Sequence, residues 1–276
     1  MTSNWDTPAA RELIARALEE DIGPGDLTSE ACVPQAAQAR GRFLAKQDLQ
    51  VAGIELLPLV YIGSFDPRIL ESSGRWVTAG TLVAEVSGPA RLLLERERVA
   101  LNFLTHLCGI ATLTRRFVER AQGVTILDTR KTLPGLRALE KLAVAAGGGR
   151  NHRLGLYDAV LIKENHIAAA GGIRRALEAV KNGSVPVEIE VRNLEELSQA
   201  LDAGATAVLL DNFAPETIRR AVDLCRGHAR VEVSGGVTLE NIAAYAAARP
   251  DFISIGALTH SAPAADITFL IDSLIP

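Results

Sequence analysis

The sequence predicts an α/β protein: an incomplete C-terminal β/α barrel preceded by a smaller N-terminal α+β domain. Two observations in the second half of the chain lead to this prediction. Short runs rich in β-branched residues alternate with helical segments at intervals of roughly 20–35 residues, which is the size of a βα unit. The runs are also almost continuously apolar, as in a parallel sheet that is buried on both faces. The first half of the chain lacks this rhythm.

The barrel is predicted from the number of repeated units. Its strands are expected at residues 124–128, 159–163, 187–191, 207–211, 230–234 and 252–256. Helices are expected between most of them, at 136–146, 173–181, 194–203, 215–225 and 239–248. Six or more such units in a row favour a barrel. An open doubly wound sheet is the alternative, but no G-x-G-x-x-G sequence follows the first strand.

The first half mixes helices and strands of uneven length. The pattern predicts, in order, a helix, a turn-rich loop, a strand, a helix and two strands, at 8–20, 21–30, 39–46, 54–62, around 70 and 81–86. A long amphipathic helix follows from 90 to 121, with an interruption near Gly109. We therefore expect an N-terminal domain over 1–112, with part of the C-terminal tail packed on it, and a barrel domain over 113–276.

Composition excludes several classes of partner. The chain has 276 residues, 48% of them hydrophobic, and a formal net charge of −4. Such a mildly acidic protein has no overall affinity for nucleic acid or for an anionic membrane. No stretch approaches the ~18–20 apolar residues of a membrane span, and the N-terminus has no apolar signal core. Three scattered cysteines predict buried thiols in a reducing compartment, so we expect a cytoplasmic protein.

Polar and charged residues gather at the carboxyl ends of the predicted barrel strands. They are Asp128 with Arg130 and Lys131, then Lys163, Glu190, Asp211, Ser234 and Gly256. In a β/α barrel these strand ends converge on one face, and that face carries the active site. A random set of strand ends would be more apolar. The convergence therefore predicts a single charged site.

The segment from Asp128 to His166 is strongly basic within a net acidic chain. Its cationic and histidine residues are Arg130, Lys131, Arg137, Lys141, Arg150, His152, Arg153, Lys163 and His166. Arginine binds carboxylates in a bidentate fork and lysine adds a point charge, so the segment indicates an anion site. Arg137 and Lys141, four apart on a helix, are better explained as a solvated face. Lys163 ends a strand that looks buried, where an unpaired ammonium would be costly.

Two carboxylates end consecutive strands. Glu190 and Asp211 suit a hard divalent cation such as Mg²⁺, held directly or through water. The alternative is that one or both form structural ion pairs with Lys163 or Arg153. Glu188 shares a strand face with Glu190, and Glu190 is preferred because it lies nearer the strand end.

Glycine-rich turns follow the last two strands. Residues 234–236 (SGG) precede a helix expected to begin near Thr238, and residues 255–260 (IGALTH) repeat the arrangement. Free N–H groups at such helix starts bind phosphate, although plain turns would look the same. His106 shares a polar helix stripe with Arg98 and Asn102, which is either an ordinary exposed face or one that reaches another subunit's site.

These residues lie in an ordered series of motifs. The series is EDIGPGDLT (20–28), ERxxLN (97–102), HLCGIAT (106–112), DTRKTLPGLR (128–137), KLAVAAGGGRNHRLGLYDAVLIKENH (141–166), VEIEV (187–191), LLDN (209–212), EVSGG (232–236) and SIGALTHS (254–261). It resembles the quinolinate phosphoribosyltransferase family, the decarboxylating nicotinate-nucleotide pyrophosphorylases. The resemblance covers nearly the whole chain and departs from the family pattern at no motif position.

The resemblance implies an activity and an assembly. The activity is transfer of phosphoribosyl from phosphoribosyl pyrophosphate to quinolinate, with Mg²⁺ as cofactor, giving nicotinate mononucleotide, pyrophosphate and CO₂ in NAD biosynthesis. The assembly is a homodimer or larger, in which Arg98 reaches the neighbouring active site. Non-catalytic or transport-associated relatives of the same superfamily, and other phosphate-binding barrel enzymes, are the alternatives.

The resemblance also implies roles for individual residues. The quinolinate site would consist of Thr129, Arg130, His152, Arg153 and Lys163, with Arg98 from the partner. Lys131 would lie near the phosphates, and with Glu190 and Asp211 it would form the catalytic set. The 5′-phosphate would be bound around Ser234, Gly235, Gly236, Gly256, Ala257 and His260.

Overall fold

The computed structural model describes residues 4–275 and divides the chain into two compact units. Within the described residues, the first unit contains 4–115, Leu133–Gly148 and 261–275. The second contains Arg116–Thr132 and Gly149–His260. Both units are therefore assembled from separate stretches of sequence.

The first unit is built on an antiparallel sheet with the strand order β12-β1-β5-β3. Its strands are β1 (Gln38–Ala45), β3 (Phe65–Ile69), β5 (Leu82–Pro89) and β12 (Ile267–Ile275). The last strand of the chain thus pairs with the first, and Phe43 lies opposite Phe269. These two rings contact each other with centroids 4.8 Å apart, and Tyr61 completes a buried aromatic cluster.

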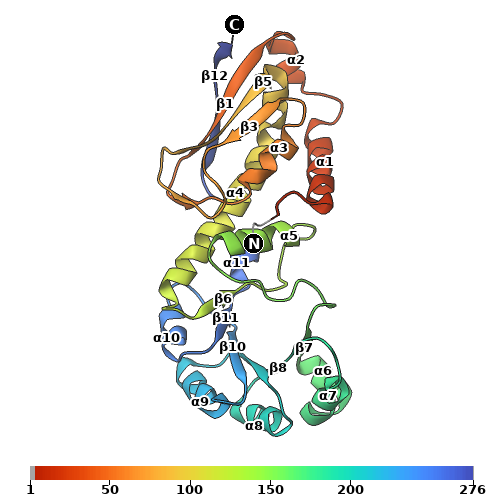
Figure 1. The fold of residues 1–276 in the computed structure, drawn as a ribbon, viewed down its shortest axis with the longest axis vertical. Coiled ribbons are helices and arrows are strands. Elements are labelled where there is room, and N and C mark those ends of the chain that lie inside the picture. The colour runs from red at the N-terminus through yellow and green to blue at the C-terminus, as the bar shows by residue number, and fades with distance from the viewer. Residues whose placement is uncertain (1–3, 276) are drawn as a thin grey trace. The chain divides into compact units, whose positions relative to one another are not determined.

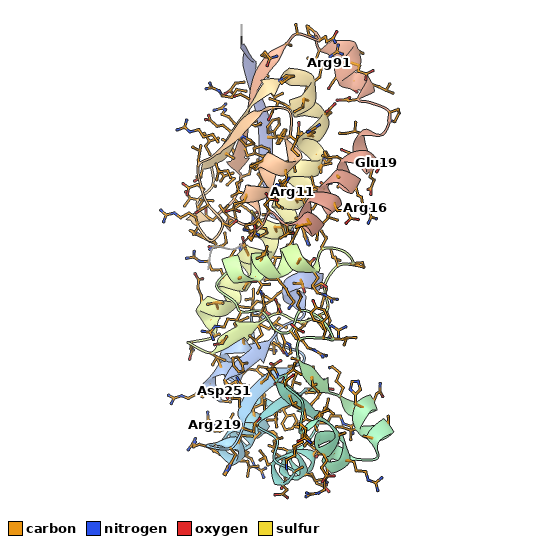
Figure 2. The ribbon with its side chains drawn as sticks, turned by 45° about the vertical axis from the view of Figure 1, so that its right-hand side comes forward. Arg11, Arg16, Glu19, Arg91, Arg219 and Asp251 are labelled. Atoms are coloured by element: carbon orange, nitrogen blue, oxygen red, sulfur yellow. The ribbon has the colours of Figure 1, made fainter. Side chains whose placement is uncertain are left out.

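Helices α1 (Pro8–Ile22) and α2 (Leu27–Cys32) begin the first unit. Thr7 caps α1 by accepting a hydrogen bond from the N–H of Ala10 at 3.1 Å. Figure 2 shows Arg16 and Glu19 pointing outward from this helix. The prediction of a loop over 21–30 is wrong from Leu27 onward, because Asp26 accepts the N–H groups of Thr28 and Ser29 and starts α2.

The first unit also contains several shorter elements. They are β2 (Leu49–Gln50), a 3₁₀ turn at Ile54–Leu56, α3 (Leu57–Val60), β4 (Trp76–Val77) and α5 (Arg137–Ala146). The helix expected at 54–62 therefore exists as a 3₁₀ turn that leads into one α-helical turn. Proline at the second position of α3 is compatible with the start of a helix.

Helix α4 (Ala90–Arg120) is continuous, so the interruption predicted near Gly109 is wrong. The glycine has a packing role instead. A Cβ at Gly109 would lie 2.2 Å from the carbonyl oxygen of Pro263, which leaves no room for any side chain. The N–H of Ala265 then donates to the carbonyl of Thr105 at 2.8 Å. The glycine therefore lets the C-terminal segment pass directly against α4.

The second unit is a parallel sheet with the strand order β6-β11-β10-β9-β8-β7. Its strands are β6 (Thr125–Leu127), β7 (Val160–Ile162), β8 (Val187–Val191), β9 (Ala207–Asp211), β10 (Arg230–Ser234) and β11 (Phe252–Ser254). The order follows the chain from β7 to β11 and then returns to β6. A doubly wound sheet would reverse its order in the middle, so this cyclic order confirms the incomplete barrel.

Helices follow most of these strands and lie outside them, as Figure 1 shows for α8 and α9. The helices are α6 (Glu164–Ala170), α7 (Ile173–Val180), α8 (Leu194–Asp202), α9 (Pro215–Cys225), α10 (Ile242–Ala247) and α11 (Ala257–His260). Strand β9 is buried along Ala207–Leu210, as expected for a strand covered on both faces. Only its last residue, Asp211, is partly exposed.

Two findings bear on the compositional predictions. No helix among residues 4–275 is long and apolar enough to cross a membrane. Cys108 and Cys225 are buried, as predicted, but Cys32 is exposed at the end of α2. Burial raises the pKa of the Cys108 thiol to about 12, so this side chain remains protonated.

Candidate active site

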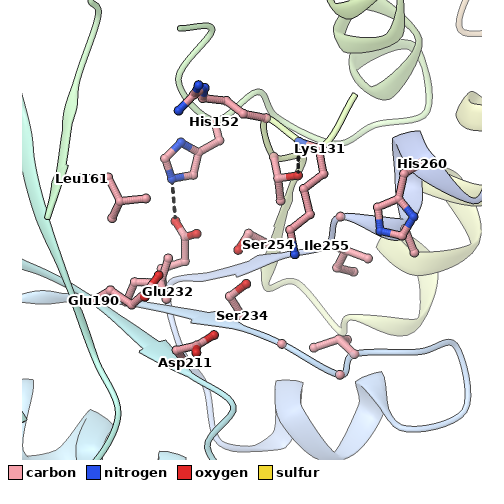
Figure 3. Close-up of a pocket in the computed structure, with 18 of the residues that line it drawn as sticks. Lys131, His152, Leu161, Glu190, Asp211, Glu232, Ser234, Ser254, Ile255 and His260 are labelled. Carbon is pink, nitrogen blue, oxygen red and sulfur yellow. Dashed lines mark hydrogen bonds and ion pairs between the residues drawn. The ribbon is translucent and has the colours of Figure 1, made fainter. Parts of the chain in front are cut away.

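A cavity of about 420 Å³ opens at the carboxyl ends of the barrel strands (Figure 3). It lies wholly within the second unit. Among the residues predicted for the site, those that line it are Thr129, Arg130, Lys131, His152, Arg153, Lys163, Glu190, Asp211, Ser234, Gly235, Gly236, Gly256, Ala257 and His260. The structure thus brings together residues that are up to 131 positions apart in the sequence, from Thr129 to His260.

Arg98 is the exception among the predicted site residues. It is exposed on α4 in the first unit and is not among the residues that line this cavity. His106, on the same helix stripe, binds Glu140, with 2.9 Å between Nε2 and Oε1. Glu140 is fully buried and also accepts the N–H of Leu133. The role of His106 in the described structure is therefore structural.

Three cations of the cavity, Arg130, Lys131 and Arg153, come from two loops. Lys131 follows β6, where its N–H donates to Thr129 Oγ1 at 3.0 Å and its carbonyl accepts from Thr259 Oγ1 at 2.8 Å. Arg153 follows the glycine-rich stretch, and its Nη1 donates to the carbonyl of Ala159 at 3.0 Å. Burial and the nearby guanidinium of Arg130 lower the pKa of Arg153. Two arginines that repel each other in this way favour an anion between them.

A buried carboxylate fixes the start of the second loop. Asp128, at the end of β6, is fully buried and accepts the backbone N–H of His152 at 2.9 Å. Next to it, the N–H of Arg153 donates to His152 Nδ1 at 2.7 Å. These bonds hold the backbone of residues 152–153 at the edge of the barrel, where both side chains reach the cavity.

Lys163 and Glu190 form an ion pair, with 2.6 Å between Nζ and Oε2. The Lys163 side chain is 48% exposed, so the expectation that it is buried is wrong: β7 ends at Ile162, and Lys163 already lies at the start of α6. The structure therefore contains the ion pair between Glu190 and Lys163 that the sequence analysis gave as the alternative to a metal site. Asp211 instead accepts a hydrogen bond from the side chain of Asn212 at 3.0 Å.

The donor set of the cavity fits a hard divalent cation. Glu190 and Asp211 both face the cavity from consecutive strands, and the hydroxyl of Ser234 lies on the next strand. All three offer oxygen, which Mg²⁺ prefers. Substrate phosphates and water would supply the remaining ligands, as is usual for this ion.

The two glycine-rich turns pack closely against neighbouring side chains where they line the cavity. Gly235 has a φ of +98°, and a Cβ there would lie 2.1 Å from Asn212 Oδ1. A Cβ at Gly256 would lie 3.0 Å from the Lys131 side chain and 3.2 Å from the His260 ring. Any larger residue would therefore narrow the cavity at the point where its wall is backbone.

The helices after these turns differ from the prediction. Helix α10 begins at Ile242 rather than near Thr238, because the segment between is a turn in which Asn241 Oδ1 accepts the N–H of Thr238 at 2.7 Å. Helix α11 contains only four residues. The contribution of helix dipoles to anion binding is correspondingly small here, and the backbone N–H groups of the turns are the main candidates.

The sequence analysis missed one residue of the cavity floor, Glu232. It lies on β10 two residues before Ser234, and it is only 3% exposed. Figure 3 shows it below the ring of His152. Side chains two apart on a strand share a face, so the assignment of Ser234 to the cavity already placed Glu232 on the same side. The sequence analysis applied this rule to Glu188 and Glu190, which share a strand face, but not to Glu232 and Ser234.

Comparison with known proteins agrees over nearly the whole chain. The profile of the quinolinate phosphoribosyl transferase N-terminal domain matches residues 26–108, and that of the C-terminal domain matches residues 110–270. The nicotinate-nucleotide pyrophosphorylase (carboxylating) of Mycobacterium leprae is 42% identical over 97% of this chain and 99% of its own length. The chloroplastic protein of the same name from Arabidopsis thaliana is 40% identical over 95% of this chain and 83% of its own length.

A solved structure shows the same fold. The nicotinate-nucleotide pyrophosphorylase of Francisella tularensis superimposes with a TM-score of 0.92 at 38% sequence identity, covering 97% of this chain and 98% of that one. With both domain profiles matched in order and a cavity that gathers the motif residues, the chain belongs to the quinolinate phosphoribosyltransferase family.

Proposed function

We propose that this protein transfers phosphoribosyl from phosphoribosyl pyrophosphate to quinolinate and releases CO₂, giving nicotinate mononucleotide and pyrophosphate. The observation that carries the proposal is the composition of one cavity. Cations, two carboxylates and two glycine-rich turns surround the same space of about 420 Å³. The relatives named as nicotinate-nucleotide pyrophosphorylases support the assignment.

A pyridine dicarboxylate matches the cationic side of the cavity. Arg130 and Arg153 repel each other there, and the two carboxylates of quinolinate would relieve that repulsion. Arginine offers a bidentate fork, so these side chains would orient the ring as well as bind it. Lys163 would add a positive charge while keeping its contact with Glu190.

The phosphoribosyl group would occupy the opposite side. Backbone N–H groups around Ser234–Gly236 and Gly256–Ala257, with His260, would bind the 5′-phosphate. Glu190 and Asp211 are the residues that would hold Mg²⁺, directly or through water. When bound, Mg²⁺ would supply positive charge that stabilises the negative charge of the departing pyrophosphate.

The residues of the chain then support two chemical steps. As pyrophosphate leaves, positive charge develops on the ribose ring, and Glu190 and Asp211 would stabilise it while Lys131 neutralises the leaving group. The pyridine nitrogen becomes cationic when it bonds to the ribose. That cation stabilises the electron pair left on the neighbouring ring carbon when its carboxylate departs as CO₂. No protein nucleophile is required.

We further propose that the protein works as a homodimer or larger assembly, in which Arg98 enters the neighbouring subunit's cavity. The exposed position of Arg98 on α4 is compatible with such a role. The proposal explains why a family motif contains an arginine that does not line the cavity of its own barrel. A cytoplasmic location stays a prediction.

The first test is the reaction itself. Purified protein given quinolinate, phosphoribosyl pyrophosphate and Mg²⁺ should release CO₂ and pyrophosphate in equal amounts. Nicotinate in place of quinolinate should release neither, because it lacks the second carboxylate. The measurement is trapping of labelled CO₂ together with a coupled pyrophosphate assay. Absence of both products with quinolinate would refute the proposed function.

The second test concerns the dicarboxylate site. Arg153→Ala should raise the KM for quinolinate by roughly 10- to 100-fold, since a charge-assisted hydrogen bond contributes about 1.5–3 kcal/mol. The KM for phosphoribosyl pyrophosphate should stay nearly constant. Arg174→Ala, on the exposed surface of α7, is the matched control and should leave both values unchanged. An unaltered KM for quinolinate in Arg153→Ala would remove this residue from the site.

The third test concerns the two carboxylates. The double variant Glu190→Gln with Asp211→Asn should lower kcat on the order of 10²–10³-fold or more, because it removes charge that stabilises the transition state. Glu195→Gln with Asp202→Asn on α8 is the control, since both of these acids are exposed. Steady-state kinetics at saturating Mg²⁺ provide the measurement. Full activity in the first double variant would defeat the assignment.

The fourth test concerns the shared site. The Arg98→Ala and Arg153→Ala proteins should each have low activity alone. Dimers that combine one subunit of each variant should recover activity. A random dimer population would have about a quarter of its sites free of both substitutions, because half of the dimers are mixed and each contains one intact site. The readout is activity after co-refolding the two variants. No recovery, in a sample shown by sedimentation to contain mixed dimers, would contradict the role of Arg98.

A further inference from the structure

Two parts of the cavity wall are assigned to phosphates, and they come from distant stretches of the chain. Lys131 follows β6 and would face the pyrophosphate, whereas Gly256, Ala257 and His260 follow β11 and would bind the 5′-phosphate. Phosphoribosyl pyrophosphate carries both of these groups on one ribose ring. Its binding therefore depends on how far apart the two parts of the wall are held.

The pairing of β6 with β11 does not by itself fix that distance. Their ladder ends where Ser254 lies opposite Leu127 and the N–H of Ile255 donates to the carbonyl of Leu127 at 2.9 Å. Lys131 comes four residues after Leu127, and the backbone between them is irregular. Beyond the end of a ladder, two segments stay together only where another contact joins them.

Thr259 supplies such a contact. Its hydroxyl donates to the backbone carbonyl of Lys131 at 2.8 Å, across 128 positions of sequence. The carbonyl of Gly256, in the same turn as Thr259, lies farther from this hydroxyl, at 3.3 Å, so the bond to Lys131 is the stronger of the two. Thr259 is only 1% exposed, so water does not compete for the bond.

The backbone of Lys131 is thus held from both sides. Its N–H donates to Thr129 Oγ1 at 3.0 Å, and its carbonyl accepts from Thr259. Thr129 belongs to the same loop as Lys131, so its bond shapes the loop locally. Thr259 belongs to α11, so its bond fixes that loop relative to the turn after β11.

Close packing extends this restraint to the side chains. A Cβ at Gly256 would lie 3.0 Å from Lys131 Cδ and 3.2 Å from His260 Nε2, so both side chains approach the same glycine. Figure 3 shows the Lys131 side chain extending toward Ser254 and Ile255, the two residues before Gly256. A shift of the loop after β6 would therefore move the lysine away from the turn assigned to the 5′-phosphate.

We propose that Thr259 is a positioning residue that sets the distance between the pyrophosphate and 5′-phosphate subsites. The inference rests on the proposed function, from which it takes the two subsites. Thr259 would act through Lys131 and not on the substrate, because its hydroxyl is directed at the Lys131 carbonyl and it is not among the residues that line the cavity.

This role predicts a difference between the whole substrate and its fragments. A ligand that reaches both subsites gains affinity because binding of its first group brings the second group to its own subsite, and the gain requires the correct spacing. Ribose 5-phosphate and inorganic pyrophosphate each reach one subsite, so their binding does not depend on the spacing. Loss of the hydrogen bond should therefore weaken the whole substrate and spare the fragments.

Thr259→Val tests the inference, because valine keeps the shape of threonine but has no hydroxyl. Calorimetry on the full chain, with Mg²⁺ and without quinolinate, measures the Kd of phosphoribosyl pyrophosphate and of each fragment. The Kd of the whole substrate should rise roughly 3- to 10-fold, as expected for one hydrogen bond. The Kd of either fragment should change by less than about twofold. In turnover, the KM for phosphoribosyl pyrophosphate should rise and the KM for quinolinate should not.

Two further comparisons separate positioning from general stability. Thr259→Ser and Thr259→Ala lose the same methyl group, but only serine retains a hydroxyl. The serine variant should therefore bind the whole substrate like wild type, and the alanine variant should bind it like Thr259→Val. Thr114→Val is the matched control, since Thr114 is fully buried on α4 and its Oγ1 has no hydrogen-bond partner among the described residues. It should leave all three Kd values unchanged.

Each outcome decides the inference. An unchanged Kd for phosphoribosyl pyrophosphate in Thr259→Val overturns it, and so does an equal weakening of the fragments, which a general disturbance of the fold would produce. If Thr259→Val does not fold, the serine and alanine pair decides by the same criteria. Wild-type protein that binds the whole substrate more tightly than either fragment, but releases no CO₂ with quinolinate, refutes the proposed function and not this inference. The two failures are therefore distinguishable.

Discussion

The pairing of β11 with β6 is the constraint on which the site depends. Ile253 lies opposite Ile126 and Ser254 opposite Leu127, so the last strand of the barrel returns to the first. Without this pairing β6 would not belong to the sheet, and Lys131 after β6 would be remote from Gly256 after β11. With it, a Cβ on Gly256 would lie 3.0 Å from the Lys131 side chain. The pairing thus brings the carboxyl end of β6 to the cavity that the ends of the other five strands line.

The positive and negative side chains of the cavity lie on different parts of its wall. Positive side chains gather in the loops after β6 and before β7, where burial and Arg130 lower the pKa of Arg153 against the opposing charges of Asp158 and Glu188. On the two following strands, β8 and β9, Glu190 pairs with Lys163 and Asp211 accepts a hydrogen bond from Asn212. We therefore propose different ligands for the two sides: a dianion for one and a cation with its phosphates for the other.

Much of the barrel and many residues of its cavity could be predicted from the sequence, for a physical reason. The bounds of β8, β9 and β10 and of α9 agree with the predicted ranges. A strand buried on both faces is recognised as a short, almost continuous apolar run, and an amphipathic helix is recognised by its 3.6-residue period. The site residues of the barrel could be placed for a related reason: fold class alone determines where strand ends meet. The resemblance to a known family then supplied the expected roles of individual residues.

What could not be predicted depends on contacts between distant residues. Gly109 looked like a helix break because its partner, Pro263, is 154 positions away and no local pattern reveals it. Lys163 was expected to be buried because the strand was taken one residue too long. Glu232 was overlooked because an acid inside an apolar run resembles an irregularity until His152 and Glu188 are seen beside it.

The antiparallel sheet of the first unit has a consequence for synthesis on the ribosome. Strand β12 occupies one edge of that sheet and pairs with β1, although more than 220 residues separate the two in the chain. The barrel strands are translated between them and can pair as soon as they emerge. The N-terminal unit, although made first, must wait with one edge of β1 uncovered until the final strand leaves the exit tunnel. Such an edge is a template for pairing with other chains, so premature termination would expose the nascent protein to aggregation.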